Sequence, residues 1–283
     1  MPINSSTERD ASDGNTSPEA QLLKQLSQRD EVDLLGVVDA GGISGSSSRG
    51  DELWTLMFCL AAWKYRGEPV RKRKLTVRTK VAKEEFGSTR ELIGCYDVVH
   101  LRARVAEDNV FGTPQALLVE IIGKHTSDDE LNKCALELQE PVTFEDSRFG
   151  TFTLDRRVNW FVAQTPWSRT NVRLSLSMDG CATPQELLSF ARSLWDSQVS
   201  WSQRITDFAA TKLLKLKNET WLEEDEEELS TQQFKTRMTL ESITVYPNRT
   251  FEFWYDDGDL FLGHAIMVSG NLRDGPTNAG IHG

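Results

Sequence analysis

The sequence predicts an α+β protein of two domains, each built from an antiparallel sheet with packed helices. The first observation is length, because 283 residues exceed the roughly 100–200 residues of a typical single domain. The second is patterning: short runs with apolar residues at every second position alternate with segments in which they recur at every third or fourth. The third is composition, since 39% hydrophobic and 27% charged residues are typical of a chain that buries a core.

The chain begins with a polar segment. Residues 1–17 contain one isoleucine and no aromatic residue, so they offer too little apolar surface to offset the entropy lost on ordering. We expect a disordered tail there. The first domain, residues 18–146, then opens with a helix from Pro18 to Arg29, entered through a Ser-Pro pair, and a strand from Leu34 to Val38.

A glycine-rich segment, residues 41–50, follows this strand and precedes an apolar segment from Asp51 to Tyr65. We expect the apolar segment to be the central helix of the first domain. A strand, a glycine-rich loop and a helix together are typical of a phosphate-binding site. However, a Walker loop needs Gly-Lys-Ser/Thr where the helix starts, and two acidic residues stand here instead. The segment is therefore interpreted as a flexible connector.

The stretch from Arg71 to Lys83 carries seven basic residues and no acidic one. Its period-two alternation predicts a strand with the charges on one face. A nucleic-acid or localisation patch is one interpretation, and an edge strand kept soluble by lysines is the favoured one. Strands from Tyr96 to Val105 and from Ala116 to Ile122, and a helix that begins at Ser127 or Asp128, complete the domain.

The second domain, residues 149–283, begins after a boundary at residues 145–148. Its first part is strand-rich, and a capping box at Thr183 then starts a helical hairpin with a continuous apolar stripe. An antiparallel three-stranded meander ends the chain, because tight turns separate its strands. The predicted strands are Met238 to Tyr246, Thr250 to Tyr255 and Leu260 to Val268.

Charge and composition exclude several classes of protein. The net charge of −11 repels a polyphosphate backbone, which disfavours nucleic acid as a partner. No apolar run approaches the roughly 20 residues of a membrane-spanning helix, and no secretory signal precedes the first domain, so we expect a cytoplasmic protein that does not enter a membrane. The cysteines form no Cys-x-x-Cys pair and are expected to be reduced thiols, without a metal or cofactor. They are Cys59, Cys95, Cys134 and Cys181.

The densest cluster of chemistry-bearing residues lies near the C-terminus and comprises Asp256, Asp257, Asp259 and His264. Carboxylates with a histidine could bind a divalent metal or form an acid–base pair. Asp-Gly is also what a tight turn requires, which favours a structural role for Asp257. We expect His264 to be buried and hydrogen-bonded to Asp256, to Asp259 or to the helix end at residues 218–219.

Two weaker clusters are candidates for recognition. In the first, arginine beside tryptophan is suited to stacking or carboxylate recognition at a protein interface, although a plain strand with Trp160 inward is the favoured interpretation. It comprises Arg156, Arg157, Asn159 and Trp160. The second ends the long helix, where we expect an asparagine cap and a tryptophan that packs back on the core. It comprises Asn218, Glu219 and Trp221.

Three blocks in the second half resemble a bacterial family known as domain of unknown function 2262. They are FGTFTLDRRVNWF at 149–161, LLKLKNETWL at 213–222 and FEFWYDDGDLFLGH at 251–264. The chain departs from the family at Leu262, where a tryptophan is expected before Gly-His. The first half resembles the small companion domain, of unknown function, that such proteins often carry. The resemblance brings no established activity with it.

Two functions of different classes remain open. The first is a non-enzymatic protein-interaction module, by analogy an immunity-type protein whose acidic surface complements a basic toxin or another protein. The second is a metal-dependent or acid–base enzyme that uses the segment from Asp256 to His264. Nucleic-acid binding through residues 71–83 is the weakest alternative, because the whole chain is acidic.

Overall fold

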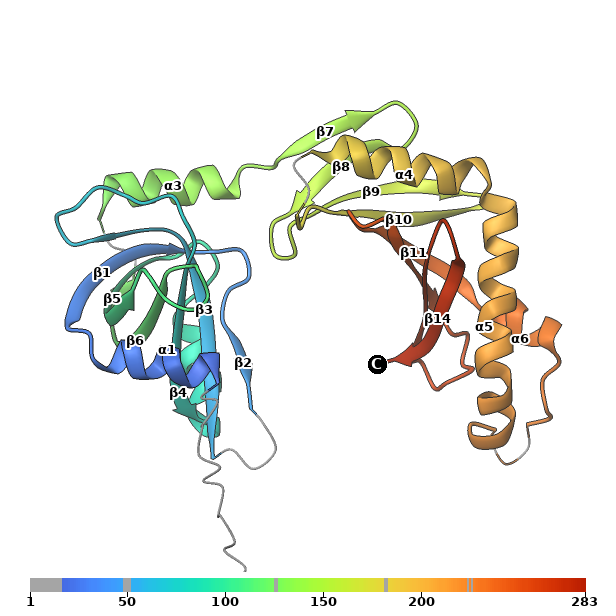
Figure 1. The fold of residues 1–283 in the computed structure, drawn as a ribbon, viewed down its shortest axis with the longest axis horizontal. Coiled ribbons are helices and arrows are strands. Elements are labelled where there is room, and N and C mark those ends of the chain that lie inside the picture. The colour runs from blue at the N-terminus through green and yellow to red at the C-terminus, as the bar shows by residue number, and fades with distance from the viewer. Residues whose placement is uncertain (1–16, 48–51, 125–126, 181–182, 223, 225) are drawn as a thin grey trace, which may run out of the picture. The chain divides into compact units, whose positions relative to one another are not determined.

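The structure, a computed structural model, describes residues 17–47, 52–124, 127–180, 183–222, 224 and 226–283. The chain divides into two compact units, Met1–Glu140 and Pro141–Gly283, and each has its own sheet and its own helices (Figure 1). The predicted α+β class is therefore confirmed. None of the helices in the described ranges is long and apolar enough to cross a bilayer.

The N-terminal unit combines a six-stranded sheet with three helices. The helix α1 begins where the Ser17 hydroxyl caps the backbone N–H of Ala20, and α3 begins where the Asp128 carboxylate caps Leu131. The elements are α1 (Pro18–Ser27), β1 (Glu31–Val38), β2 (Ser44–Ser46), β3 (Leu53–Tyr65), β4 (Leu75–Ala82), α2 (Lys83–Leu92), β5 (Val98–Ala106), β6 (Gln115–Lys124) and α3 (Asp129–Gln139).

This sheet closes into a barrel. Its strand order is β1-β5-β6-β4-β3-β2, and β1 pairs with β3 as well, which joins the two ends and leaves only β2 outside the ring. All pairings are antiparallel except that of β4 with β6. Five strands in this order, with α2 between the third and fourth strands of the ring, make the OB-fold, a Greek-key barrel. Its interior is filled by the apolar side chains that alternate along each strand.

The C-terminal unit has an eight-stranded sheet and three helices. The α5 helix is 23 residues long, and Ser230 and Gln233 form a capping box at the start of α6. The elements are β7 (Thr143–Asp146), β8 (Gly150–Asp155), β9 (Trp160–Trp167), β10 (Thr170–Ser177), α4 (Pro184–Asp196), α5 (Gln198–Thr220), α6 (Thr231–Arg237), β11 (Thr239–Val245), β12 (Thr250–Asp256), β13 (Ala265–Asn271) and β14 (Gly275–His282).

The strands of the second sheet lie in the order β14-β13-β12-β11-β10-β9-β8-β7, and the sheet stays open. Only β10 and β11 run parallel, because the helices α4 to α6 connect them. These helices pack on one face of the sheet (Figure 1) and share a large aromatic core with it. The opposite face carries half-buried aromatic and polar side chains.

Two predictions for the first domain are wrong. Residues 53–65 form the strand β3 and not a helix: Leu56, Phe58 and Leu60 point into the barrel at every second position. Apolar side chains at the outward positions, such as Met57, concealed this alternation from the sequence. The basic strand β4 is also not an edge strand, because it pairs with β3 on one side and with β6 on the other.

The C-terminal meander is confirmed, with differences at its end. Residues 260–264 form a turn, so that β13 starts at Ala265, and a fourth strand, β14, follows it. Because β14 contains proline, two glycines and an asparagine, its sequence has little of the β-branched pattern that predicts a strand.

Two predicted segments lie wholly or partly outside the described residues. Residues 1–16, almost all of the predicted disordered tail, lie outside the described residues, as do residues 48–50 of the glycine-rich segment. Residues 143–146 form β7 and pair with β8 of the second sheet. Independent folding of residues 18–146 and 149–283 stays a prediction.

Candidate functional site

The turn at residues 256–264 is held together by its own carboxylates. Asp257 is 2% exposed, and its two oxygens accept hydrogen bonds from the backbone N–H groups of Asp259 (3.2 Å) and Phe261 (2.5 Å). Asp256 Oδ1 accepts from the N–H of Gly258 at 2.9 Å. Each carboxylate therefore satisfies backbone donors in the turn, as the Asp-Gly sequence predicted.

His264 finds a partner within the same turn. Its Nδ1 lies 2.6 Å from the carbonyl oxygen of Phe261, and its ring packs against Trp221 at a centroid distance of 5.5 Å. The expected partners Asp256, Asp259 and residues 218–219 are not its hydrogen-bond partners, because the turn brings a nearer backbone oxygen to the ring. Among the residues described, no three His, Cys, Asp or Glu side chains are arranged to hold a metal ion.

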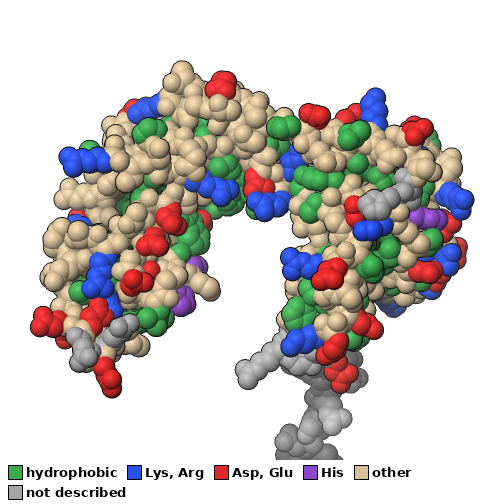
Figure 2. Space-filling model, turned by 180° about the vertical axis from the view of Figure 1, so that it is seen from behind, with side chains coloured by type: hydrophobic (Ala, Val, Ile, Leu, Met, Phe, Trp, Pro, Cys, Tyr) green, Lys and Arg blue, Asp and Glu red, His purple; other side chains and the backbone are tan. Residues whose placement is uncertain are grey.

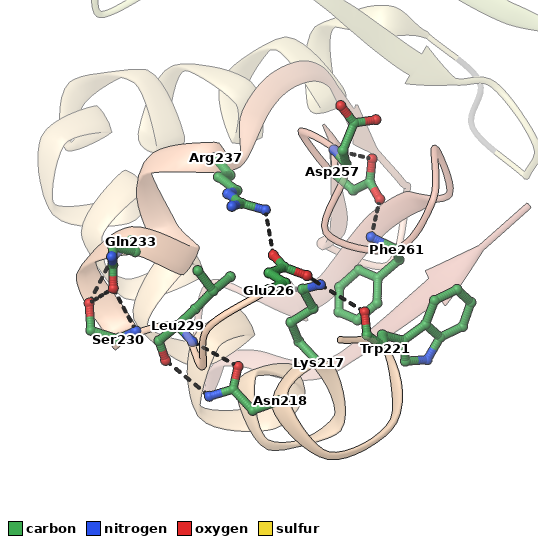
Figure 3. A network of polar contacts seen from close by, with 11 residues as sticks. Lys217, Asn218, Trp221, Glu226, Leu229, Ser230, Gln233, Arg237, Asp257 and Phe261 are labelled. Atoms are coloured by element: carbon green, nitrogen blue, oxygen red, sulfur yellow. Dashed lines mark hydrogen bonds and ion pairs between the residues drawn. The ribbon is translucent and has the colours of Figure 1, made fainter. Parts of the chain in front are cut away.

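The helix end at residues 217–221 fastens the segment that follows it (Figure 3). Asn218 exchanges two hydrogen bonds with the backbone of Leu229, at 3.0 and 3.1 Å. Lys217 is 1% exposed, donates to the carbonyl oxygen of Trp221 at 2.8 Å and pairs with Glu226. Asn218 therefore ties down the chain after α5 and does not cap that helix.

The remaining residues of this cluster divide between surface and core. Glu219 is exposed and lies 3.6 Å from Lys215 on the same helix, a pair of small energetic value. Trp221 packs edge-on against Phe261 at 5.6 Å, as predicted. These residues have structural partners, and nothing in their geometry points to a ligand.

The hairpin between β8 and β9 brings the second predicted cluster to a turn. Arg157 donates two side-chain hydrogen bonds to Asp155, and this guanidinium lowers the pKa of that carboxyl. Asn159 adopts a left-handed conformation (φ +57°) and donates to Asp179 at 3.3 Å. Arg156 lies in the same turn, half-buried. These residues lie in one turn, but the Arg157 guanidinium is already paired with the Asp155 carboxylate.

Trp160 differs from the prediction that it points into the core. It lies half-buried on the face of the sheet opposite the helices, in a cavity of about 500 Å³ that Tyr246, Glu252 and Asp179 also line. Trp160 and Tyr246 meet edge to face, with ring centroids 6.2 Å apart. The parallel pairing of β10 with β11 places β9 and β12 on either side of this cavity; that long-range pairing cannot be inferred from residues 156–160 alone.

A second concave surface lies on the outside of the N-terminal barrel, and we call it the barrel groove. Its volume is about 470 Å³. Thr55 and Met57 of β3 and Arg78 and Lys80 of β4 line it, and the register pairs Thr55 with Lys80 and Met57 with Arg78. The other residues that line it come from α1, from the end of β2 and from the loop between β5 and β6: Glu19, Leu23, Ser46, Ser47 and Phe111.

Arg78 is the central charge of the barrel groove. Its side chain is only 11% exposed. One terminal nitrogen donates to Gln115 at 2.7 Å and the other lies 3.5 Å from the Glu19 carboxylate. The Nε atom is buried and has no hydrogen-bond acceptor among the described residues. Such a donor is costly to leave unsatisfied, and the guanidinium that carries it belongs to a residue that lines the groove.

The loop between β5 and β6 presents an aromatic ring to this arginine. Phe111 is 45% exposed, and the Arg78 guanidinium lies 5.9 Å from its ring centroid. Asn109 fixes the loop, because its side chain donates to the carbonyl oxygens of Ala106 and Thr113 and accepts from the N–H of Phe111. The backbone that carries the exposed ring is therefore fixed by local hydrogen bonds.

The rest of the basic segment is largely neutralised. Arg71, Lys72, Arg73 and Lys74 pair with Glu68, Glu137, Glu107 and Asp39 respectively. In the view of Figure 2, basic and acidic side chains are interspersed over the surface. Lys80 differs, because it has no ion-pair partner among the described residues.

The cysteines in the described ranges are free: Cys59, Cys95 and Cys134. Burial raises the pKa of the Cys59 thiol, Cys134 is buried against the barrel, and Cys181 lies outside the described residues. A raised pKa makes a thiol a poor nucleophile at neutral pH.

Sequence reasoning missed Arg78 and Phe111 as a pair, as well as Tyr246 and Glu252. The alternation of Thr76, Arg78 and Lys80 was recognised, but the groove depends on α1 and on a loop more than 30 residues away in the chain. The only available signal was an exposed-looking Phe111 between Asn109 and Gly112, a typical turn sequence.

The comparisons with known families confirm the resemblance of the second half and extend it to the first. Residues 146–281 match the family described as an uncharacterized protein conserved in bacteria (DUF2262). Residues 19–138 match a domain of unknown function, DUF7021. Among curated proteins none matches the chain.

Two solved structures are similar to part of the chain. One is a small single-stranded DNA-binding protein from Streptomyces coelicolor, with 13% identity, a TM-score of 0.20, and coverage of 35% of this chain and 95% of that chain. The other is the wild-type single-stranded DNA binding protein from Thermus aquaticus, with 10% identity, a TM-score of 0.21, and coverage of 52% and 72%.

These two structures overturn the partner prediction, which disfavoured nucleic acid and named a basic toxin or another protein. That prediction rested on net charge, an average over the whole chain that does not describe a single face of one domain. Residues 19–138 are thus similar to the family DUF7021, and residues 146–281 are similar to the family DUF2262.

Proposed function

We propose that this protein is a non-enzymatic binding module whose N-terminal barrel holds single-stranded nucleic acid in the barrel groove. The observation that carries the proposal is Arg78, a nearly buried guanidinium in the groove with an unsatisfied Nε. We propose the cytoplasm as its location, in keeping with the free cysteines of the described ranges.

The position of the groove supports the proposal. An OB-fold binds oligonucleotides and oligosaccharides on the face of its second and third strands, between the loop that joins strands 1 and 2 and the loop that joins strands 4 and 5. In this barrel those strands are β3 and β4, and the second of those loops is the one that carries Phe111. The groove is therefore at the place where this fold binds extended polymers.

The chemistry of the groove favours nucleic acid over a neutral sugar chain. Arg78 and Lys80 supply two positive charges for phosphates. Phe111 supplies a ring on which a base can stack, and such stacking contributes about 1–3 kcal/mol per base and tolerates any sequence. Met57 and Leu23 add apolar contact area.

Enzymatic chemistry at residues 256–264 has less support. The carboxylates of Asp256 and Asp257 are occupied by backbone donors, and His264 Nδ1 contacts a backbone oxygen. A general acid or base must instead face a substrate.

The test is fluorescence anisotropy with a labelled oligodeoxythymidine of about 16 nucleotides, the upper end of the site size of one OB-fold. Lys80→Gln is expected to weaken binding and to reduce the slope of log K against log salt by about 1. Lys72→Gln, in the same segment, removes the same charge where Glu137 already neutralises it, and is expected to bind like the wild type.

Phe111→Ala provides a second variant that separates stacking from charge. Because the ring is exposed and belongs to a loop, its removal should leave the fold intact. We expect weaker binding with an unchanged salt slope. Equal affinity of the wild type and of both groove variants, Lys80→Gln and Phe111→Ala, would contradict the proposal.

A further inference from the structure

We infer that the cavity lined by Trp160, Tyr246, Asp179 and Glu252, on the helix-free face of the C-terminal sheet, binds a methylated ammonium group. We call it the aromatic cavity. It belongs to the second unit and is independent of the nucleic-acid proposal, which concerns the first unit only.

The walls of the aromatic cavity are two nearly perpendicular rings. The indole of Trp160 and the phenol of Tyr246 make an angle of 88° and their centroids are 6.2 Å apart. Both rings are half-buried, so each keeps part of its surface open to the cavity. Perpendicular aromatic walls are typical of sites for quaternary ammonium groups, because the negative faces of the rings attract the cation.

The charge of the cavity matches this ligand. Two of the residues that line the cavity, Glu252 and Asp179, carry carboxylates, and no lysine or arginine lines it. Apart from the two aromatic residues, the remaining lining residues are uncharged: Ser177, Pro247, Asn248 and Thr250. Arg249 lines the neighbouring cavity instead. A diffuse organic cation gains from the rings and the carboxylates at once, whereas a metal ion requires several oxygen ligands at short distance.

Glu252 and Tyr246 are held in position before a ligand binds. Glu252 Oε2 accepts hydrogen bonds from the Tyr246 hydroxyl at 2.9 Å and from the Trp254 indole at 3.1 Å. Burial, together with this hydrogen bond, raises the pKa of Tyr246, so the phenol stays a neutral donor. Little ordering cost therefore remains at binding.

The size of the cavity agrees with a small head group. At about 500 Å³, it falls within the range of small-molecule sites. A free choline-type molecule and a trimethylated lysine side chain offer the same chemistry here. Titration with choline and with a peptide that contains trimethyllysine distinguishes these two sources by which one binds more tightly.

The experiment is a titration of the full-length protein with choline, followed through the indole N–H signals in two-dimensional NMR. The matched probe is 3,3-dimethylbutanol, which has the shape of choline without its charge. We expect choline to shift the Trp160 signal and to bind about tenfold more tightly than the alcohol, since cation–π and carboxylate attraction together exceed 1.4 kcal/mol.

Glu252→Gln retains the shape and an acceptor oxygen and removes one charge, and it should weaken choline binding about tenfold. Asp179→Asn lies at an exposed turn and serves as a second variant if Glu252→Gln alters the fold. The control is Glu241→Gln, an exposed carboxylate of β11 outside the cavity. Equal binding of choline and the alcohol, or unchanged choline affinity in both cavity variants, would overturn the inference.

Discussion

The two units differ in how their sheets form a core: one sheet closes into a barrel, and the other stays open and is covered by helices. In the first unit β1 pairs with β3 and closes the barrel, so the core lies inside and the outer face of β3 and β4 is free for side chains such as Arg78. In the second unit the sheet stays open, and α4 to α6 must cover one face to form a core. The barrel therefore offers its strands' outer surface to a ligand, whereas the open sheet offers only the face that its helices leave.

The first prediction tests whether the two cores are independent. Phe253 is fully buried between Trp167 and Phe251, and Phe253→Ala should destabilise the second unit by about 3–5 kcal/mol. Phe58→Ala should do the same to the barrel. Denaturant unfolding, followed by near-ultraviolet circular dichroism, should show one transition moved by each variant. If each variant moves both transitions equally, the two units unfold as one cooperative block.

The second prediction concerns the turn at residues 256–264, which joins β12 and β13 of the open sheet. Asp257→Ala removes the acceptor of two backbone N–H groups, one of them buried. The loss should be about 1–3 kcal/mol, the usual cost of an unsatisfied buried donor, and it should affect only the transition of the second unit. Asp259→Asn is the control and should change stability much less, because the position is exposed and asparagine tolerates its left-handed conformation (φ +63°).

The third prediction concerns how the unfolding free energy of the barrel depends on pH. Burial of Asp128 acts against ionisation and is the largest single influence on its pKa. The hydrogen bonds from Lys64 and from the backbone N–H of Leu131, together with the charge of Lys64, outweigh burial and lower the pKa of Asp128. A lowered pKa stabilises the fold above the unfolded value, and this contribution is lost as the pH falls through the folded value. Asp128→Asn should therefore cost about 1 kcal/mol at pH 7 and less below pH 4.

The measurement for this variant is the unfolding free energy of the barrel from pH 7 down to pH 3. The transition of the second unit should keep the same pH dependence in wild type and variant. If the unfolding free energies of the wild-type barrel and the Asp128→Asn barrel differ by the same amount at every pH, the charge of Asp128 does not contribute to stability.

The smallest expected effect concerns the groove itself. Leu22 and Leu26 hold α1 on the barrel, and Glu19 of this helix lies 3.5 Å from Arg78, where a phosphate would bind. Glu19→Gln should therefore raise oligonucleotide affinity a few-fold, through one fewer repulsive charge at the site. Glu31→Gln, which removes a carboxylate paired with Arg104, should leave affinity unchanged. If Glu19→Gln leaves the affinity unchanged, as Glu31→Gln should, then the Glu19 carboxylate does not repel the oligonucleotide at the groove.

Local chemistry explains what the sequence by itself determined. The start of α1 at Ser17 and the start of α3 at Asp128 each depend on a capping side chain and a backbone N–H three positions apart. The turn at Asp257 is local in the same way, and the meander follows from its tight turns. Net charge and composition, by contrast, are averages over the whole chain and do not describe a single face of one domain.

The tertiary structure decided everything that depends on pairing between distant segments. Residues 53–65 are a strand because β1 and β4 pair with both of its edges. The groove exists because closure of the barrel brings Glu19, Arg78 and Phe111 together, and the aromatic cavity exists because β10 pairs with β11. A periodic pattern specifies which face of a strand is apolar, but not which strand will lie beside it, since that depends on the free energy of the whole packed sheet.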